Sequence, residues 1–157
     1  MKIVFVCTGN IFRSMSAEYC AKKVAQDMGM ELEISSAGTM ATPQSPDPVT
    51  LETLKSFGVA EITHKQTKLS KDLIEKNDLV IAMGIDHKEF IKERFGVDVP
   101  LFNELANGKS EGVLDIHENV EDWLEHREAT ENHIIETVTH IYESMPGLLS
   151  NLKGRKP

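Results

Sequence analysis

Apolar and polar positions alternate along the chain in blocks that predict strands and helices in turn. Residues 2–7 contain an unbroken apolar run, Ile-Val-Phe-Val, and residues 78–83 contain a second one, as expected for strands buried on both faces. Residues 14–28 show helical spacing before Gly29, and residues 127–145 show it before Pro146-Gly147. The remaining pattern predicts strands at 32–35 and 97–101, helices at 48–57, 70–76 and 86–95, and a polar loop at 103–120.

The order of these segments predicts an α/β fold. Apolar strands that alternate with helices form βαβ units, in which a parallel sheet is covered by helices on both faces. No repeat or linker interrupts the pattern, so we expect a single domain over residues 1–157 whose last five to eight residues form a frayed tail. Ligands of such folds bind at the carboxyl ends of the strands, which is where Cys7 is placed.

Composition narrows the functional classes. The chain has 157 residues, 27% of them charged, and a formal net charge of −8, which argues against a nucleic-acid partner. Its N-terminal apolar run is shorter than the apolar region of a signal peptide, and no stretch is long enough to span a bilayer. The two cysteines, Cys7 and Cys20, do not form a disulfide framework. We therefore expect a cytoplasmic protein with free thiols, in which Cys20 fills the core.

The segment FVCTGNIFRSMS, residues 5–16, contains the candidate chemistry. A loop between a strand and a helix N-terminus can direct its backbone N–H groups, the helix dipole and the Arg13 guanidinium toward one tetrahedral oxyanion. The same positive field stabilises a thiolate at Cys7, which makes this side chain a candidate nucleophile. Gly9 permits a tight turn, Asn10 can hold the loop through its amide, and Ser14 can donate a hydrogen bond to the sulfur.

Other oxyanion and metal sites fit the sequence less well. A Walker A loop requires a lysine and a second glycine that this segment lacks. The histidines at positions 126, 133 and 140 recur every seven residues, a step of about 10 Å along a helix that is too long for shared metal ligation. We expect these histidines on a solvated helix face, and we expect neither a metal nor a cofactor.

The segment VCTGNIFRSMSAE resembles the active-site loop of the low-molecular-weight protein tyrosine phosphatases, in which Cys-x5-Arg-Ser follows the first strand. Further segments are similar to later parts of the same family: SSAGT, PDPVTLETLKSFGV, THKQTKLSKDL and DLVIAM. The resemblance therefore covers most of the chain. It implies a three-layer, flavodoxin-like, doubly wound domain with a central, mainly four-stranded parallel sheet.

The resemblance also implies roles for individual residues. Cys7 would attack phosphorus and form a phosphocysteine, and Arg13 would bind the phosphoryl oxygens together with the loop amides. His64 matches the histidine that braces the loop, although it could also be an ordinary surface histidine. The phosphate-binding loop would consist of Thr8, Gly9, Asn10, Ile11, Phe12 and Ser14.

The general acid is less directly specified, because the family's late Val/Ile-x-Asp-Pro pattern is absent. Asp115 and Asp122 are the candidates. We prefer Asp122, because its separation from Cys7 is closer to the family's usual one and a helix is expected soon after it. Trp123 would then supply the aromatic wall for a phenyl ring, although it could equally be a core aromatic.

The loop residues indicate the substrate. Relatives that act on phosphotyrosine tend to have an aliphatic residue at the position of Ile11, whereas relatives that act on phosphoarginine tend to have threonine. We therefore expect a phosphotyrosine protein or peptide as substrate, phosphate and vanadate as inhibitory oxyanions, and a monomer or weak homodimer. Protein arginine phosphatase, arsenate reductase and a silent phosphate-binding module remain alternatives, but residues 81–92 lack the cysteines of an arsenate relay. Phe12 replaces the family's protective second loop cysteine, so we expect Cys7 to over-oxidise readily.

Overall fold

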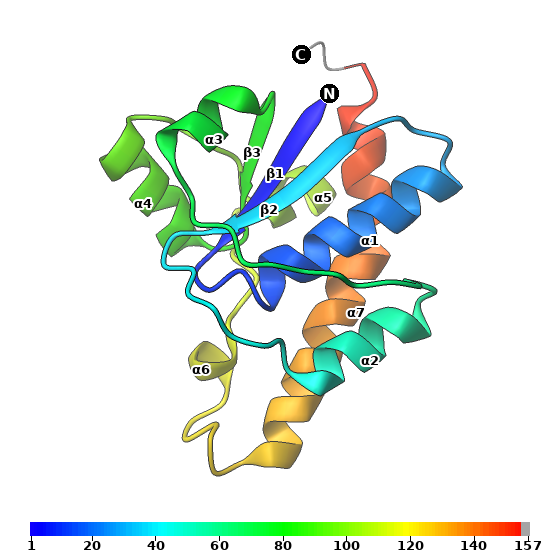
Figure 1. Ribbon diagram of the computed structural model, residues 1–157, viewed down its shortest axis with the longest axis vertical. Coiled ribbons are helices and arrows are strands. Elements are labelled where there is room, and N and C mark those ends of the chain that lie inside the picture. The colour runs from blue at the N-terminus through cyan, green and yellow to red at the C-terminus, as the bar shows by residue number, and fades with distance from the viewer. Residues whose placement is uncertain (155–157) are drawn as a thin grey trace.

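The computed structural model describes residues 1–154 and shows strands alternating with helices, as the sequence pattern predicts (Figure 1). Of the expected C-terminal tail, residues 155–157 lie outside the described part of the chain. The elements are β1 (Lys2–Cys7), α1 (Arg13–Asp27), β2 (Glu33–Gly38), α2 (Pro48–Ser56), α3 (Lys71–Lys76), β3 (Leu79–Ala82), α4 (Ile85–Phe95), α5 (Phe102–Asn107), α6 (Ile116–Asn119) and α7 (Arg127–Leu152).

The sheet is parallel and has the strand order β2-β1-β3. After β2 the chain crosses to the opposite side of β1, so the order reverses at β1 and opens a crevice at its carboxyl end. The expected strand at 97–101 is reduced to one bridge between Ala82 and Leu101. Pro100 accepts a hydrogen bond from the Ala82 N–H at 3.0 Å but has no N–H to donate, which limits pairing here. The sheet thus has three strands and a bridging segment where four strands were expected.

Helices cover both faces of the sheet. On one face α1, α5 and α7 cover the inward side chains of β1, and α2 packs against α1 and α7; on the other face lie α3 and α4 (Figure 1). Because side chains alternate along a strand, Ile3, Phe5 and Cys7 face the first layer, whereas Val4 and Val6 face the second. This two-sided burial explains the unbroken apolar run in the sequence of β1.

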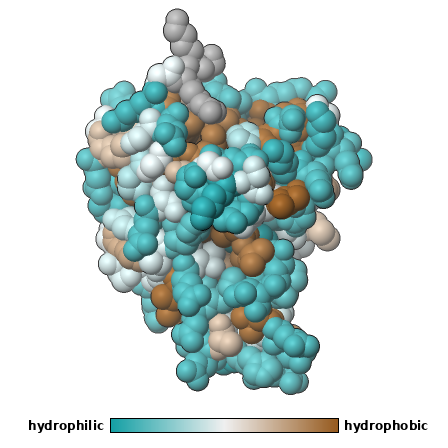
Figure 2. All heavy atoms as spheres, turned by 180° about the vertical axis from the view of Figure 1, so that it is seen from behind, coloured by the Kyte–Doolittle hydropathy of each residue, from teal (hydrophilic) through white to brown (hydrophobic). Residues whose placement is uncertain are grey.

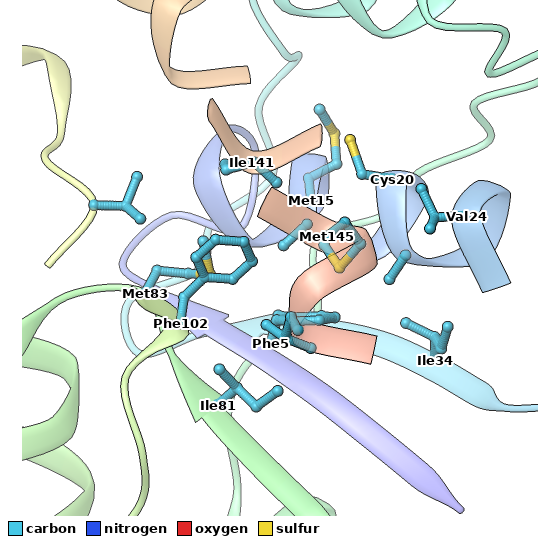
Figure 3. Close-up of a cluster of buried hydrophobic side chains, with 14 of the residues drawn as sticks. Phe5, Met15, Cys20, Val24, Ile34, Ile81, Met83, Phe102, Ile141 and Met145 are labelled. Carbon is cyan, nitrogen blue, oxygen red and sulfur yellow. The ribbon is translucent and has the colours of Figure 1, made fainter. Parts of the chain in front are cut away.

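The larger core lies between the sheet and the α1–α7 layer (Figure 3). The Phe5 and Phe102 rings pack with their centroids 6.3 Å apart, and Met15 and Met145 fill the space between α1 and α7. Cys20 is completely buried in this core, and burial raises the pKa of its thiol to about 12. Cys20 therefore fills the core, as expected from the sequence, and remains protonated at neutral pH.

The last helix is longer than its sequence predicts. We expected it to end before Pro146-Gly147, but α7 continues through Pro146 to Leu152. A proline inside a helix costs about 3 kcal/mol, whereas burying one large aliphatic side chain gains about 1.5–3 kcal/mol. Leu148, Leu149 and Leu152 lie beyond the proline and are all buried, so their packing outweighs its cost.

The segment at 103–120 is also more ordered than the expected polar loop. It contains α5 and the short α6. Phe102 and Leu105 anchor α5 in the core, and the Glu104 carboxylate accepts a hydrogen bond from the Leu101 N–H at 2.8 Å. Two buried apolar side chains in a six-residue helix are too weak a pattern to recognise from the sequence.

The outer surface is mainly polar. Seen from behind, it is largely hydrophilic, with apolar patches interrupted by polar side chains (Figure 2). Within residues 1–154, no helix has both the length and the apolar character that crossing a membrane requires.

Candidate active site

The loop between β1 and α1 forms the floor of a pocket at the point where the strand order reverses. The pocket has a volume of about 250 Å3, and Cys7 lies in it at the carboxyl end of β1. Side chains from the opposite segments close its sides. Its lining residues are Cys7, Thr8, Gly9, Asn10, Ile11, Phe12, Arg13, Gln44, Asp115, Ile116, His117 and Trp123.

A hydrogen bond from Ser14 supports the sulfur of Cys7. The two atoms, Cys7 Sγ and Ser14 Oγ, lie 2.9 Å apart in a buried environment. Asn10 Nδ2 donates to the same Ser14 oxygen at 2.9 Å. Because that oxygen accepts from Asn10, its one hydrogen can point at the Cys7 sulfur or at the Ala37 carbonyl oxygen, which lies farther away at 3.3 Å. The shorter contact favours the sulfur, as a thiolate nucleophile or leaving group requires.

Asn10 fixes the shape of the loop. It has a left-handed backbone conformation with φ of 57° and is completely buried, and asparagine tolerates this conformation better than most residues. Its side chain also donates to Ser36 Oγ at 2.8 Å and accepts from the Thr67 N–H at 2.9 Å. His64 Nε2 donates to the Asn10 carbonyl oxygen at 2.6 Å, so His64 lies in the bracing position that the sequence resemblance implies.

Gly38 allows β2 to end against this loop, a role that the sequence analysis missed. A Cβ at Gly38 would lie 2.4 Å from the Thr8 carbonyl oxygen, which is closer than non-bonded atoms can approach. The next two residues, Thr39 and Met40, donate their N–H groups to the carbonyls of Cys7 and Thr8 at 2.9 Å each. The end of β2 therefore holds the first two residues of the loop.

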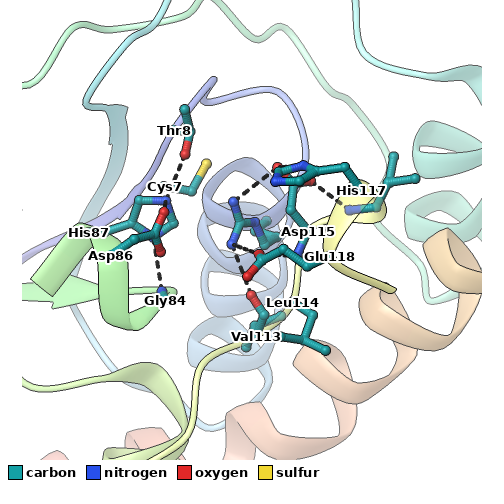
Figure 4. Close-up of polar contacts among 12 residues, drawn as sticks. Cys7, Thr8, Gly84, Asp86, His87, Val113, Leu114, Asp115, His117 and Glu118 are labelled. Carbon is teal, nitrogen blue, oxygen red and sulfur yellow. Dashed lines mark hydrogen bonds and ion pairs between the residues drawn. The ribbon is translucent and has the colours of Figure 1, made fainter. Parts of the chain in front are cut away.

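Arg13 is buried and paired with two carboxylates (Figure 4). Its Nη2 lies 3.2 Å from Asp115 Oδ2, and its Nη1 lies 3.6 Å from Glu118 Oε1. Nη1 also donates to the Val113 carbonyl at 2.9 Å. The guanidinium is thus fixed from the side of residues 113–118, which brings Asp115 into the pocket that contains Cys7.

The preferred acid, Asp122, does not reach this pocket. It lines an adjacent cavity with Glu121, Leu124 and Glu125, and this cavity shares His117 and Trp123 with the active-site pocket. Asp122 is exposed, and its backbone has a left-handed conformation with φ of 48°. Asp115 caps the short α6 instead, and α6 points its N-terminus at Arg13. Our expectation for the position of Asp122 was therefore wrong, because the sequence did not reveal α6. Trp123 does line the pocket and is partly exposed.

His87 supports the loop from the opposite side, and the sequence analysis overlooked it. It is buried at the start of α4, where its Nδ1 accepts from the Gly84 N–H at 2.9 Å. Its Nε2 therefore bears the hydrogen in the neutral ring and donates to Thr8 Oγ1 at 2.8 Å. Burial, and then the Arg13 charge, lower the pKa of His87 to about 4. Gly84 leaves room for this ring, because a Cβ there would lie 3.1 Å from His87 Nδ1.

The histidines at positions 126, 133 and 140 do not share a solvated helix face as expected, and His126 directly precedes α7. His126 is exposed and His140 is half-buried, but His133 is buried and only 6% exposed. Their seven-residue spacing does not decide exposure, because residues 113–120 cover His133 and Asn103 contacts His140. Among residues 1–154 no cluster of three potential metal ligands occurs.

The fold and the pocket together define an α/β protein with a cysteine-based oxyanion loop. The model of the family "Low molecular weight phosphotyrosine protein phosphatase" matches residues 2–156. The chain therefore belongs to this family, in which the matched relatives are phosphatases, and it has the family's fold.

Two curated relatives illustrate the range of the family. The chain is 37% identical over 119 residues to the protein-arginine-phosphatase of Bacillus subtilis, a match that covers 73% of this chain and 79% of that protein. It is 31% identical over 155 residues to the low molecular weight protein-tyrosine-phosphatase PtpB of Staphylococcus aureus, covering 98% of this chain and 97% of the relative.

Solved structures agree with this family assignment. A mutant of YwlE from Bacillus subtilis superimposes with a TM-score of 0.83 at 31% identity, covering 98% of this chain and 99% of that chain. A second mutant, of YwlE arginine phosphatase with a phosphorylated active-site serine, gives a TM-score of 0.85 at 30% identity and covers 99% and 98% of the two chains.

Proposed function

We propose that this phosphatase hydrolyses phosphotyrosine in proteins through a phosphocysteine on Cys7. The observation that carries the proposal is that Cys7, Arg13 and Asp115 line one pocket. In that pocket the Cys7 sulfur is hydrogen-bonded to Ser14 Oγ at 2.9 Å. In the first step the Cys7 thiolate attacks phosphorus, an S–P bond forms, and the bond from phosphorus to the phenolic oxygen breaks. The Arg13 guanidinium and the loop N–H groups bind the phosphoryl oxygens.

We assign the general acid to Asp115. It donates a proton to the departing phenolic oxygen, whose conjugate acid has a pKa of about 10 and which therefore leaves poorly as an anion. In the second step water attacks phosphorus, the S–P bond breaks, and the Asp115 carboxylate takes the proton of the water. Phosphate leaves and the Cys7 thiolate returns. The position of Asp115 beside Arg13, 3.2 Å away, supports this assignment over Asp122.

The pocket walls favour an aromatic leaving group. Ile11, Ile116 and Trp123 line the entrance with apolar surface, which suits a phenyl ring better than a hydrophilic guanidinium. A phosphorylated serine in a related YwlE arginine phosphatase mutant supports a covalent intermediate at the loop nucleophile.

Phosphoarginine is the second candidate substrate, because a protein-arginine-phosphatase is among the most similar curated relatives at 37% identity. A comparison of kcat/KM on matched phosphotyrosine and phosphoarginine peptides decides between the two. We expect phosphotyrosine to be preferred. Preference for phosphoarginine would overturn the substrate assignment but not the mechanism.

The chemistry itself is tested with p-nitrophenyl phosphate in the presence of EDTA. We expect turnover in the wild type and none after Cys7→Ser. If the wild type binds phosphate without turnover, the chain is a silent binding module. The free thiols of Cys7 and Cys20 support a cytoplasmic location, and we further propose inhibition by phosphate and vanadate and a monomer or weak homodimer.

A further inference from the structure

His133 lies at the centre of a set of contacts that the proposed reaction does not explain. It projects from α7 toward the segment that contains Asp115, and its side chain is buried. Its Nε2 lies 3.1 Å from the Leu114 carbonyl oxygen, and its Nδ1 lies 3.1 Å from Asn119 Nδ2. One ring thus contacts both sides of α6, at the residue before Asp115 and at the last helical residue (Figure 4 shows Leu114 and Asp115).

These partners indicate which ring nitrogen donates and which accepts. The Leu114 carbonyl can only accept a hydrogen bond, so Nε2 donates to it. Asn119 Nδ2 can only donate, so Nδ1 accepts from it. A neutral imidazole with its hydrogen on Nε2 satisfies both contacts at once. Neither leucine nor a short amide side chain could bond to both sides of α6 in this way.

His133 also contacts the phosphate-binding loop. Its ring packs against the Phe12 ring with 6.1 Å between centroids and an interplanar angle of 57°. Phe12 is buried and directly precedes Arg13. His133 therefore connects α7, the loop that contains Cys7, and the segment that contains Asp115. In Figure 1 the yellow segment with α6 runs past α7 before it joins that helix.

We propose that His133 is a positioning residue that holds Asp115 over the phosphate-binding loop. The inference rests on Asp115 being the general acid of the proposed function. The Leu114 carbonyl and the Asp115 N–H belong to the same planar peptide group. The hydrogen bond from His133 to this carbonyl therefore sets the direction in which the chain enters α6. Loss of this bond lets Asp115 move from the leaving group, while Cys7, Ser14 and Asn10 retain their mutual hydrogen bonds.

The test compares two substrates that need the acid to different extents. Phenyl phosphate has a poor leaving group and depends on protonation, whereas p-nitrophenyl phosphate has a much better one. We expect His133→Asn to lower kcat/KM on phenyl phosphate by ~10-fold and on p-nitrophenyl phosphate by no more than about 2-fold. The quantity kcat/KM covers the steps up to departure of the leaving group, so hydrolysis of the phosphocysteine, which both substrates share, does not enter the comparison. His133→Gln can still donate to Leu114 through its terminal amide and should retain most of the activity on both substrates.

The ratio of the two rates separates positioning from stability. A partly unfolded variant loses both rates by the same factor, so equal losses after His133→Asn would overturn the proposal. Asn119→Ala removes only one of the two hydrogen bonds, and we expect a smaller shift of the ratio in the same direction. His126→Gln is the control, from the residue that directly precedes α7; its side chain is exposed and lies outside the pocket, and the ratio should remain unchanged.

The Asp115→Asn background separates this inference from the proposed function. Once the acid is absent, His133→Asn should not change the ratio further, and an additional change would contradict the proposal. If Asp115→Asn itself leaves both rates unchanged, the acid assignment fails and the role of His133 fails with it. If Asp115→Asn changes the ratio and His133→Asn does not, only the role of His133 is overturned.

Discussion

The Arg13 guanidinium and the Asp115 carboxylate form an ion pair in the active-site pocket, with 3.2 Å between Nη2 and Oδ2. The arginine side chain is 2% exposed, whereas the aspartate is 26% exposed. The group that would bind the phosphoryl oxygens and the group that would protonate the leaving oxygen therefore contact each other. Binding of a phosphate dianion must compete with Asp115 for Arg13 and turn the carboxyl group toward the leaving oxygen.

Asp115→Asn should lower kcat on phenyl phosphate by ~10²-fold or more, the size of a typical general-acid contribution. Asparagine keeps the shape of the side chain but cannot donate a proton to the departing oxygen. Asp122→Asn is the matched control and should leave kcat within about 2-fold of wild type, because Asp122 lines a different cavity. Steady-state kinetics of the two variants decide the assignment, and the reverse pattern would restore Asp122 as the acid.

Glu118→Gln should tighten the binding of inorganic phosphate by a few-fold. The Glu118 carboxylate lies 3.6 Å from Arg13 Nη1 and accepts the Asp115 N–H at 2.8 Å. Glutamine can still accept that hydrogen bond but no longer competes with the dianion through its charge. The inhibition constant of phosphate against p-nitrophenyl phosphate measures the effect, and it should shrink at high salt. Weaker phosphate binding in this variant would show that Glu118 acts mainly by holding Arg13.

The sequence predicted much of the fold and one half of the site. The β1 strand, the α1 helix and the loop between them follow from local patterns, because the Cys7–Ser14 segment is continuous in the chain. The other half could not be predicted in this way. Asp115 reaches Arg13 only because a four-residue helix turns it inward, and a helix this short has no periodicity to recognise.

The buried histidines could not be predicted either, because they contact segments distant in sequence. His87 and His133 look like ordinary polar positions on amphipathic helices, and the spacing of His126, His133 and His140 suggested solvent exposure. His133 is buried because segment 113–120, distant in sequence, covers it. Burial of a polar side chain by a distant loop leaves no trace in the local pattern around that side chain.

The pKa of His87 predicts a pH dependence of stability. Burial and the nearby Arg13 lower this pKa from 6.5 to about 4, although Asp86 and Asp115 act in the opposite direction. Between these two values the unfolded chain binds a proton that the folded chain does not. The contribution of His87 to the free energy of unfolding should therefore be fully present above pH 6.5. It should be lost as the pH decreases toward 4, and the loss amounts to about 3 kcal/mol.

Urea unfolding at pH 7 and pH 5 measures this contribution. His87→Gln removes the titrating ring, so we expect its free energy of unfolding to be lower than that of wild type at pH 7 but to change less between the two pH values. His126→Gln provides the matched control, since His126 is exposed, and should retain the wild-type difference. An unchanged pH dependence in His87→Gln would mean that other groups cause the loss of stability.

The oxidation chemistry of Cys7 should depend on Phe12. Cys7 and Cys20 are both free, and Cys20 is a fully buried thiol whose pKa burial raises to about 12. Cys20 is therefore unsuited to attack a sulfenic acid on Cys7 at neutral pH. Without a resolving thiol the sulfenic acid proceeds to sulfinic acid, which dithiothreitol does not reduce. We expect hydrogen peroxide to inactivate the wild type in a largely irreversible manner.

Phe12→Cys should convert this inactivation into a reversible one. The new thiol can condense with the Cys7 sulfenic acid to give a disulfide and water, and dithiothreitol then restores both thiols. Because Phe12 is buried and packs against His133, its removal also costs stability, and Phe12→Ser serves as the control for that loss. Activity recovered after peroxide and dithiothreitol should be substantial in Phe12→Cys and small in Phe12→Ser and wild type. Equal recovery in all three proteins would show that the residue at position 12 does not control the oxidation of Cys7.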